Sequence, residues 1–563
     1  MNALVPLPVI LPLLGAGLTL MLSKHQGLQR VVSTTVLATV VAIAGVLLVQ
    51  ADRHGPQVVW IGAWPEPLGI SLVADRVSSL MLLVSAVVAL AVLVYSIGQG
   101  MTGDDRDTPL TIYHPTFLVL AAGVGNAFLA GDLFNLFVSF EMLLFASYVL
   151  LTLGGTASRV RAGTIYVVVN MLSSMLFLIS IAAIYAATGS INLAQLADRI
   201  RDLPDPVSLM LQLLLLTTFA IKAAVFPLSF WLPDSYPTAP APVTAVFAGL
   251  LTKVGVYAIM RTQTLLFPDS PLSDLLLWAA LLTMLVGILG AVAQSDIKRM
   301  LSFTLVSHIG YMLFGIGLAT VAGLSGAIFY VVHHITIQTA LFLVLGLVER
   351  RAGSTSLIRL GGLARVAPVL GVLFFVPAMN LAGIPPMSGF LGKVGLTEAG
   401  LQVDTPLAYA LVASGMVTSL LTLYAVAKTW NLAFWRTPAQ AHEMARELSD
   451  PDGSSGPLAL PLVRHRDHIH VGASTFGSHD LEEARRIVDE GDGTDQDLHQ
   501  LLESDALPSR LPSTMVGAAV SLIAFSLGLT LVAGPLFGYT ERAAHDMLER
   551  DLYISTVLSG PAR

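Results

Sequence analysis

The sequence predicts an all-α protein that crosses a lipid bilayer about fourteen times, each time as a helix of about 20 residues. Of its 563 residues, 55% are hydrophobic and only 12% are charged, whereas soluble domains carry about 25% charged residues. Two apolar segments are interrupted by prolines, and broken backbone survives inside a bilayer only where it is buried in protein or lines a wet cavity. This composition is typical of a polytopic membrane protein.

The expected spans follow one another through short polar loops. They lie at 3–23, 31–50, 77–98, 114–130, 132–153, 163–187, 207–229, 241–262, 272–293, 297–318, 322–348, 367–399, 406–434 and 513–536. The first lacks a preceding basic segment and a clear cleavage site, so we expect it to be retained. The loop 51–75 suits a small hairpin outside the bilayer, and 191–201 has the pattern of a short amphipathic surface helix.

The distribution of lysine and arginine predicts the orientation. Basic residues follow spans one, five, nine, eleven and thirteen: Lys24, Arg30, Arg159, Arg161, Lys298, Arg299, Arg350, Arg351, Arg359, Arg365 and Arg436. All these loops fall on one side if both termini lie on the other. We therefore expect them in the cytoplasm, with both termini extracytoplasmic. The loop 101–113 supports neither orientation.

The stretch from Leu215 to Met260 organises the chain, because two apolar arms flank a proline-rich middle and each arm carries one lysine. Pro227 and Pro233 cannot lie in one continuous helix, since each removes a backbone donor. Lys222 and Lys253 would each cost at least about 2.5–3.5 kcal/mol at the bilayer centre. Lysines kept at that cost usually mark an ion path, although a lysine near a helix end can also snorkel to the interface.

A second interrupted span repeats this arrangement. The segment IPPMSGFLGK at 384–393 resembles FPLSFWLP at 226–233: both place proline, serine and an aromatic residue in mid-span, with a lysine nearby. Pro385 and Pro386 would break this helix, and Lys393 follows. Interrupted segments at corresponding positions of two halves are typical of inverted-repeat transporters. The domains would then be N-terminal helices 1–113, repeats 114–262 and 263–436 of five spans each, a hydrophilic cytoplasmic insertion 437–511, and a last helix with its tail at 512–563.

Glu141 lies in an apolar span with no other charge from Leu133 to Ala157. An isolated carboxylate at that depth needs a partner, and Lys222 is the natural one; a structural hydrogen bond from a protonated glutamate is the alternative. Span eleven carries His333 and His334, whose side chains point about 100° apart on a helix. Neutral imidazole can relay a proton through its two nitrogens; the alternative is that either ring simply packs between helices. His308 is a weaker candidate.

Together these groups form a row, with one ionisable side chain near mid-span on each of several helices: Glu141, Lys222, Lys253, His333 or His334, and Lys393. Such a row, joined by water, can pass protons in the plane of the membrane. Loss or neutralisation of the Glu141 charge would release a proton from Lys222 towards Lys253 and then Lys393. Coupling to the membrane potential is plausible at about 2.3 kcal/mol per charge per 100 mV.

Other chemistries find little support. The chain contains no cysteine, which excludes disulfides and thiolate-based sites. His465, His468 and His470 cluster within the insertion, but their spacing fits no specific ligand pattern, and a solvated loop is favoured. We therefore predict no metal site, no cofactor, no catalytic residue and no nucleic-acid partner.

These motifs resemble the antiporter-like membrane subunits shared by Mrp-type Na⁺/H⁺ antiporters, respiratory complex I and membrane-bound hydrogenases. The resemblance covers about 75–435 and rests on three segments: FNLFVSFEML, FPLSFWLPDSYPTAPAPVTAVFAGLLTKVGVY and AGIPPMSGFLGK. It implies fourteen helices with broken helices seven and twelve, two inverted five-helix repeats, and ion translocation. Glu141 and Lys222 then correspond to the family's paired glutamate and lysine, Lys253 to its central lysine and Lys393 to its terminal ionisable residue.

Within the family, GLLTKVGVYAIMRT resembles the D-type member of Mrp antiporters, and Lys393 stands where the complex I M-type subunit is expected to have glutamate. The resemblance implies a secondary-transporter subunit of a bacterial cell membrane, not an enzyme, working with the other Mrp subunits (A, B, C, E, F and G) on protons and Na⁺. The alternative is a proton-pumping subunit of complex I or of a membrane-bound hydrogenase. A scaffold without conduction would not need three intramembrane lysines and a glutamate. The 437–511 insertion departs from the family's usual short connection.

Overall fold

The computed structural model describes residues 2–62, 64, 69–99, 110–153, 155, 157–268, 270–442 and 511–559. The chain divides into two compact units. The first comprises 1–347, 372–427 and 511–563, and the second comprises 348–371 and 428–510. Every candidate site residue of the sequence analysis falls in the first unit.

Long helices make up most of the first unit. They are α1 (Leu7–Met21), α2 (Gln26–His54), α3 (Arg76–Gln99), α4 (Tyr113–Leu129), α5 (Leu133–Thr152), α6 (Ala157–Thr188), α8 (Asp205–Ala223), α12 (Ser273–Ala293), α13 (Ile297–Gly317), α14 (Val321–Ala352), α18 (Pro406–Thr429) and α22 (Ser513–Leu531). Among the described residues, 11 helices are long and apolar enough to cross a membrane. The all-α polytopic prediction is confirmed, and the expected count of about fourteen spans is consistent with these helices and the shorter ones beside them.

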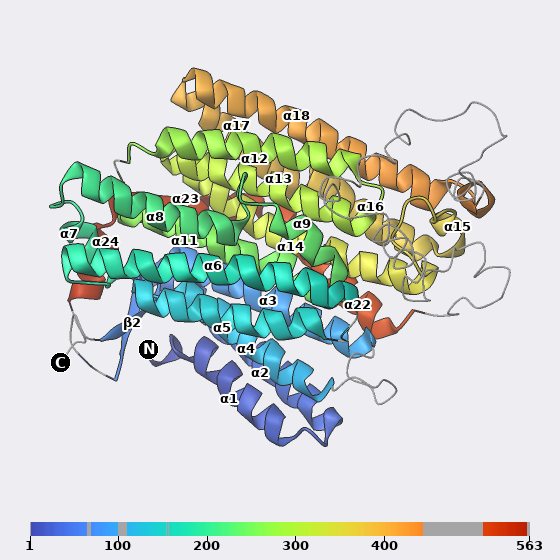
Figure 1. Cartoon of the computed structure of the whole chain (residues 1–563), viewed down its shortest axis with the longest axis horizontal. Helices are drawn as coiled ribbons and strands as arrows, with labels where there is room; N and C mark the ends of the chain where they lie inside the picture. The colour runs from blue at the N-terminus through green and yellow to red at the C-terminus, as the bar shows by residue number, and fades with distance from the viewer. Residues whose placement is uncertain are drawn as a thin grey trace, which may run out of the picture. The chain divides into compact units, whose positions relative to one another are not determined.

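Two helical hairpins recur in the chain. The pair α4 and α5 lies side by side, as does the pair α12 and α13 (Figure 1). Each second helix is preceded by an N-cap aspartate whose side chain accepts a hydrogen bond from a backbone N–H three residues on: Asp132 for α5 and Asp296 for α13. A capping carboxylate satisfies an otherwise unpaired donor and interacts favourably with the helix N-terminus. Helices of 32 residues, α6 and α14, follow the two hairpins.

The next long span after α6 and the next long span after α14 are both broken. The helix α8 ends at Ala223 because Ala224 has a left-handed conformation, with φ 58°, and prolines follow. The later helix α16 (Pro368–Ala382) ends before Gly383, and α17 (Ser388–Val403) begins after Pro385 and Pro386. A cis bond occurs in each break, at Phe226–Pro227 and at Pro385–Pro386. The expected spans 207–229 and 367–399 therefore do not run unbroken.

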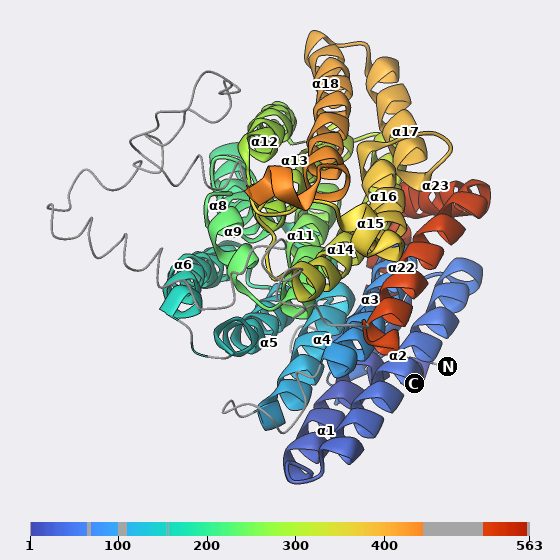
Figure 2. The same cartoon turned by 90° about the vertical axis from the view of Figure 1, so that its right-hand side faces the viewer.

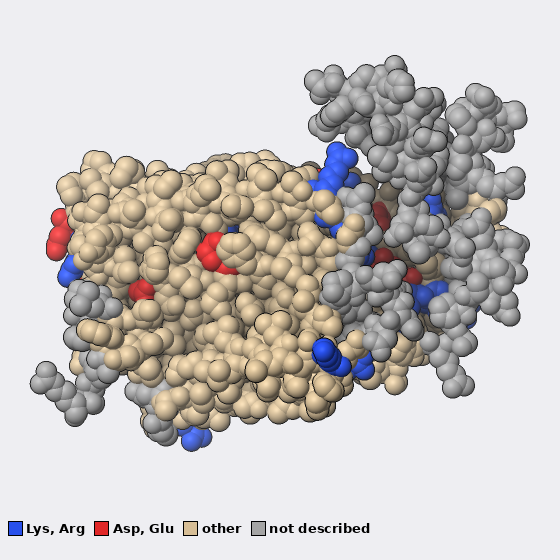
Figure 3. Space-filling view, turned by 60° about the horizontal axis from the view of Figure 1, so that its bottom comes forward, with Lys and Arg blue, Asp and Glu red and all other residues tan. Residues whose placement is uncertain are grey.

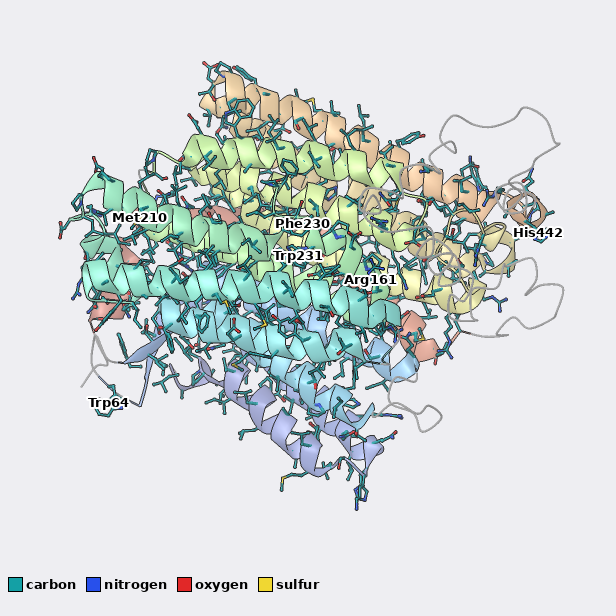
Figure 4. All side chains as sticks on the ribbon, viewed as in Figure 1. Trp64, Arg161, Met210, Phe230, Trp231 and His442 are labelled. Carbon is teal, nitrogen blue, oxygen red and sulfur yellow. The ribbon has the colours of Figure 1, made fainter. Side chains whose placement is uncertain are left out.

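Short elements connect the two arms of the first break. They are α9 (Trp231–Ser235), the 3-10 turn η3 (Tyr236–Thr238), α10 (Ala241–Val246), the π-helical segment η4 (Phe247–Leu251) and α11 (Thr252–Leu265). In Figure 4, Trp231 lies among the helices next to Phe230. The Trp231 side chain is buried and donates a hydrogen bond to the Ile221 carbonyl (3.1 Å), whereas Phe230 is 62% exposed. The indole therefore ties α9 back onto the end of α8.

The expected hairpin and short helix are both present. Strands β1 (Gln57–Ile61) and β2 (Ile70–Ala74) pair antiparallel, with Gln57 opposite Ala74. Helix α7 (Leu193–Arg199) is preceded by Asn192, whose side chain caps its first turn. Beyond α22, the expected tail is ordered into two further helices, α23 (Ala533–Glu549) and α24 (Asp551–Leu558). The C-terminal segment is therefore more structured than the hydropathy pattern indicated.

The first helical hairpin, α1 with α2, packs against α4, as seen from the side in Figure 2. Large apolar side chains are exposed on the outside of the helices, for example Val168, Leu172, Met175 and Ile179 of α6. Their spacing of three and four residues places them on one helix face. The face shown in Figure 3 has few acidic or basic side chains among its described residues. A surface of this kind suits contact with lipid chains.

The second unit contains α15 (Leu363–Val366) and the π-helical segment η5 (Trp430–Trp435). The Arg436 guanidinium donates hydrogen bonds to the carbonyls of Leu357, Ile358 and Leu360, and so fastens the loop to the end of η5. Most of the predicted insertion, including the histidines at 465, 468 and 470, lies outside the described residues.

Candidate functional site

Lys222 occupies the last turn of α8, where the helix stops. The side chain is 4% exposed, and its ammonium group donates hydrogen bonds to the Asn170 carbonyl (3.3 Å) and the Ser174 hydroxyl (2.9 Å). It also lies 5.6 Å from the centre of the Phe140 ring. The C-terminal end of a helix carries partial negative charge, which favours a cation there. The helix break thus supplies part of the setting that holds a buried ammonium group.

Glu141 lies in α5, next to Phe140, and interacts electrostatically with Lys222. The two side chains do not form an ion pair within 4.0 Å, and the Oε1 atom of Glu141 has no hydrogen-bond partner among the described residues. The expected direct pairing is therefore replaced by coupling at longer range. A carboxylate so placed can change its distance to Lys222 without first breaking a hydrogen-bonded salt bridge.

Lys253 is fully buried in the first turn of α11. Its ammonium group donates a 2.5 Å hydrogen bond to the Ala248 carbonyl, which belongs to the π-helical segment η4. A π turn widens the helix and is frequent at functional sites. The carbonyl that accepts from Lys253 lies five residues earlier in the chain, so the π turn itself provides the hydrogen-bond acceptor.

Helices α8 and α11 pack closely where the two lysines sit. A Cβ added at Gly255 would lie 2.7 Å from the Ala223 nitrogen, so only glycine fits there. No described hydrogen bond joins Lys222 to Lys253. An aromatic cluster lies near both lysines instead. The Tyr166 ring stacks on the Phe247 ring with 6.2 Å between ring centres, and the Tyr236 ring centre lies 5.8 Å from that of Phe247. The Tyr236 hydroxyl is buried without a described partner.

A cluster of imidazole and phenol rings follows on α13 and α14. The His308 ring lies 5.2 Å from the His334 ring, and the Tyr330 hydroxyl is 3.1 Å from His308 Nδ1. His333 Nδ1 contacts the Ser388 hydroxyl at 3.0 Å. Both ring nitrogens of His334 and the Nε2 atom of His333 are buried with no partner among the described residues. Such nitrogens are ready acceptors or donors for a proton relay.

Both histidines of span eleven therefore belong to one cluster, and His308 connects it. The sequence favours His333 and His334 over His308 as relay residues, and its hydropathy pattern does not single out Tyr330. A signal was present, because Tyr330 precedes His333 and His334 by three and four residues, the spacing of neighbours on one helix face. Helical spacing alone could not place α13 beside them.

Lys393 lies in α17, and its ammonium group donates to the carbonyls of Leu381 (3.1 Å) and Ala382 (2.9 Å), the last residues of α16. The ammonium group is also 5.2 Å from the centre of the Tyr311 ring, and that ring is 5.2 Å from Tyr330. Lys393 is 8% exposed. Like Lys222, it is a buried cation at the C-terminal end of a broken helix, which is a favourable place for positive charge.

The arrangement separates into two parts. Glu141 and Lys222 form one part, held by α5, α6 and α8. Lys253, the histidine cluster and Lys393 form the other, since His334 and His308 both interact electrostatically with Lys253 and Lys393. Like charges repel, so a proton on one of these groups disfavours a proton on the next. We therefore expect a proton to occupy these groups one after another rather than all of them at once.

Comparison with known proteins agrees with this architecture. The family described as "NADH:quinone oxidoreductase/Mrp antiporter, TM" matches residues 130–422, and the chain belongs to that family. It is 40% identical over 466 residues to the D-type subunit of the Na⁺/H⁺ antiporter of Alkalihalophilus pseudofirmus, covering 82% of this chain and 92% of the relative. It is also 40% identical over 458 residues to the protein of the same name from Bacillus subtilis. That match covers 80% of this chain and 92% of the relative.

Two solved structures share the fold. A chain of the Mrp complex from Dietzia sp. DQ12-45-1b superposes with a TM-score of 0.82 at 33% identity, covering 99% of this chain and 100% of the other. A chain of an archaeal membrane-bound sulfane sulfur reductase gives a TM-score of 0.80 at 23% identity, with the same coverage. The second likeness concerns the fold alone.

Proposed function

We propose that this protein is the proton-translocating subunit of a multisubunit Na⁺/H⁺ antiporter, equivalent to the D-type subunit of its relatives and assembled with the other Mrp subunits (A, B, C, E, F and G). One observation carries the proposal: three buried lysines, Lys222, Lys253 and Lys393, each donate to a backbone carbonyl and each lie beside a helix break or a π turn. Intramembrane ammonium groups are costly and are usually retained for transport. The names of the relatives at 40% identity point the same way.

The proton route would run along the row from Glu141 through Lys222, Lys253 and the histidines to Lys393. An ionised Glu141 favours the ammonium form of Lys222 through its charge. Movement or protonation of Glu141 removes that stabilisation, and the proton leaves for the next group. Water is needed between Lys222 and Lys253. The Tyr236 hydroxyl of the neighbouring aromatic cluster is buried without a described partner and could bind such a water. The histidine cluster then carries the charge to Lys393.

The two helical hairpins, the two 32-residue helices and the two broken helices support an inverted repeat, with repeats at 114–262 and 263–436. Each would contain five spans, and an odd number reverses the sense of insertion. The basic loops support a cytoplasmic location for the ends of α1 and α5 and the start of α13. Both termini would then lie outside the cytoplasm of a bacterial cell.

The proposal is tested in inverted vesicles that hold the whole complex, with proton movement followed by a pH-sensitive dye after Na⁺ addition. Glu141→Ala and Lys222→Ala should each abolish Na⁺-dependent proton movement while leaving complex assembly intact. Lys24→Ala is the matched control, because Lys24 is an exposed lysine. Full exchange by both assembled variants would rule out the pair as the switch. Proton movement without any need for Na⁺, driven by electron transfer, would instead assign the chain to a redox complex.

A further inference from the structure

A buried ion pair lies beyond Lys253 along the same helix face. Lys253, Tyr257 and Arg261 of α11 are spaced four residues apart, which aligns their side chains on one side of the helix. Arg261 is 6% exposed and forms a salt bridge with Asp75, which is 7% exposed. At about 1.5 Å per residue, Arg261 is about 12 Å along the helix axis from Lys253. The pair closes the polar face of α11 at the end where β2, α7 and α24 lie (Figure 1).

Every partner in this pair is held in place. Asp75 precedes α3, and its Oδ1 atom accepts from the Ser78 N–H (2.8 Å), so only the Oδ2 atom faces Arg261. The Arg261 guanidinium also donates to the Tyr257 hydroxyl at 3.1 Å, which in turn donates to the Phe128 carbonyl at 2.9 Å. A carboxylate at a helix N-terminus is a stable, fixed acceptor.

The C-terminal helix covers the pair. The ring of Tyr553 in α24 lies 5.1 Å from the Arg261 guanidinium carbon, on which the Tyr257 ring also packs at 5.4 Å. Other ionisable groups close by are Asp132 at the start of α5 and Tyr539 of α23, both of which interact with this cluster electrostatically. The Oδ2 atom of Asp132 is buried with no partner among the described residues. The region is thus polar, enclosed and incompletely hydrogen-bonded.

We propose that the Asp75–Arg261 ion pair, covered by Tyr553, is a gate on the passage between Lys253 and this end of the protein. The inference rests on the proposed role of Lys253 in proton transfer. Arg261 keeps its proton in proteins, so it cannot pass one on, and while Asp75 holds it and Tyr553 covers it, it blocks the end of the polar face. The gate opens when the ion pair separates and the guanidinium moves aside, and it closes when the pair re-forms.

The test uses the complete complex in vesicles without Na⁺, with passive proton flux driven by a potassium diffusion potential. Asp75→Asn combined with Arg261→Gln removes both charges, keeps the shape of the side chain at 75 and leaves a shorter polar side chain at 261. We expect passive proton flux to rise about tenfold, which corresponds to a barrier lowered by about 1.4 kcal/mol. Adding Lys253→Ala should abolish this leak. The matched control is Arg542→Gln, which removes a half-exposed arginine that pairs with Asp52 at the same end of the protein.

The gate proposal is overturned if the double variant assembles and its passive proton flux does not rise. It is also overturned if the leak persists when Lys253 is replaced. Should the double variant fail to assemble, Tyr553→Ala decides, because it uncovers the ion pair without removing a charge; a leak supports the gate and tight vesicles overturn it. Lys253→Ala by itself tests the proposed function separately. If that variant exchanges Na⁺ for protons normally, the proton route is wrong whatever the ion-pair variants do.

Discussion

A single methyl group at Gly383 is expected to disable Lys393. Gly383 joins α16 to the second proline break with a φ of 87°, a conformation that non-glycine residues rarely adopt. A Cβ there would lie 3.0 Å from Lys393 Cδ and 3.2 Å from Nζ. Gly383→Ala therefore adds backbone strain of about 1–3 kcal/mol and pushes the ammonium group away from the carbonyls of Leu381 and Ala382.

The expected loss follows from those two hydrogen bonds. A hydrogen bond to a charged group contributes about 1.5–3 kcal/mol, and about 1.36 kcal/mol corresponds to a tenfold change in rate. Displacing the ammonium group from even one carbonyl should therefore change Na⁺-dependent proton movement about tenfold or more. The assay is dye-monitored exchange in inverted vesicles, with complex assembly measured on native gels.

Gly528→Ala in α22 is the matched control, because a Cβ at that position would meet no atom within 4 Å. It should assemble and transport like the unmodified protein. The reasoning about Lys393 is refuted if the Gly383→Ala complex assembles fully and exchanges at the unmodified rate. A loss of assembly in Gly383→Ala alone would show that the break serves folding first, and Gly383→Asn, which tolerates positive φ better than alanine, then separates strain from displacement.

Two further substitutions probe the contacts of the row. Ser174→Ala removes the side-chain acceptor of Lys222 and should slow exchange several-fold. Ser180→Ala is the control and should not slow exchange, because the Ser180 hydroxyl bonds within α6. Equal rates in both variants would contradict the role of the Ser174 hydroxyl. Tyr330→Phe deletes the phenol that contacts His308 and should slow exchange in the same assay, with the exposed Tyr409 as the control position. Unchanged exchange in Tyr330→Phe would place the proton route elsewhere.

Local chemistry was enough to predict much of this protein. Runs of apolar residues predicted the helices, because a bilayer demands about 20 such residues in succession. Prolines at 227 and 385 predicted the broken helices, since proline cannot donate a backbone hydrogen bond. The row of Glu141, the lysines and the histidines stood out because an ionisable side chain is costly in an apolar span. These are properties of residues and their near neighbours.

Contacts between distant segments decided the rest. Lys222 was expected to bind Glu141, but the structure gives its ammonium group to Asn170 and Ser174 of α6. His308 became central only when α13 packed beside α14. The salt bridge of Asp75 with Arg261 joins residues 186 positions apart, and no periodicity in the sequence brings them together. Hydropathy determines which segments enter the membrane, whereas side-chain packing among those segments determines which buried charges meet.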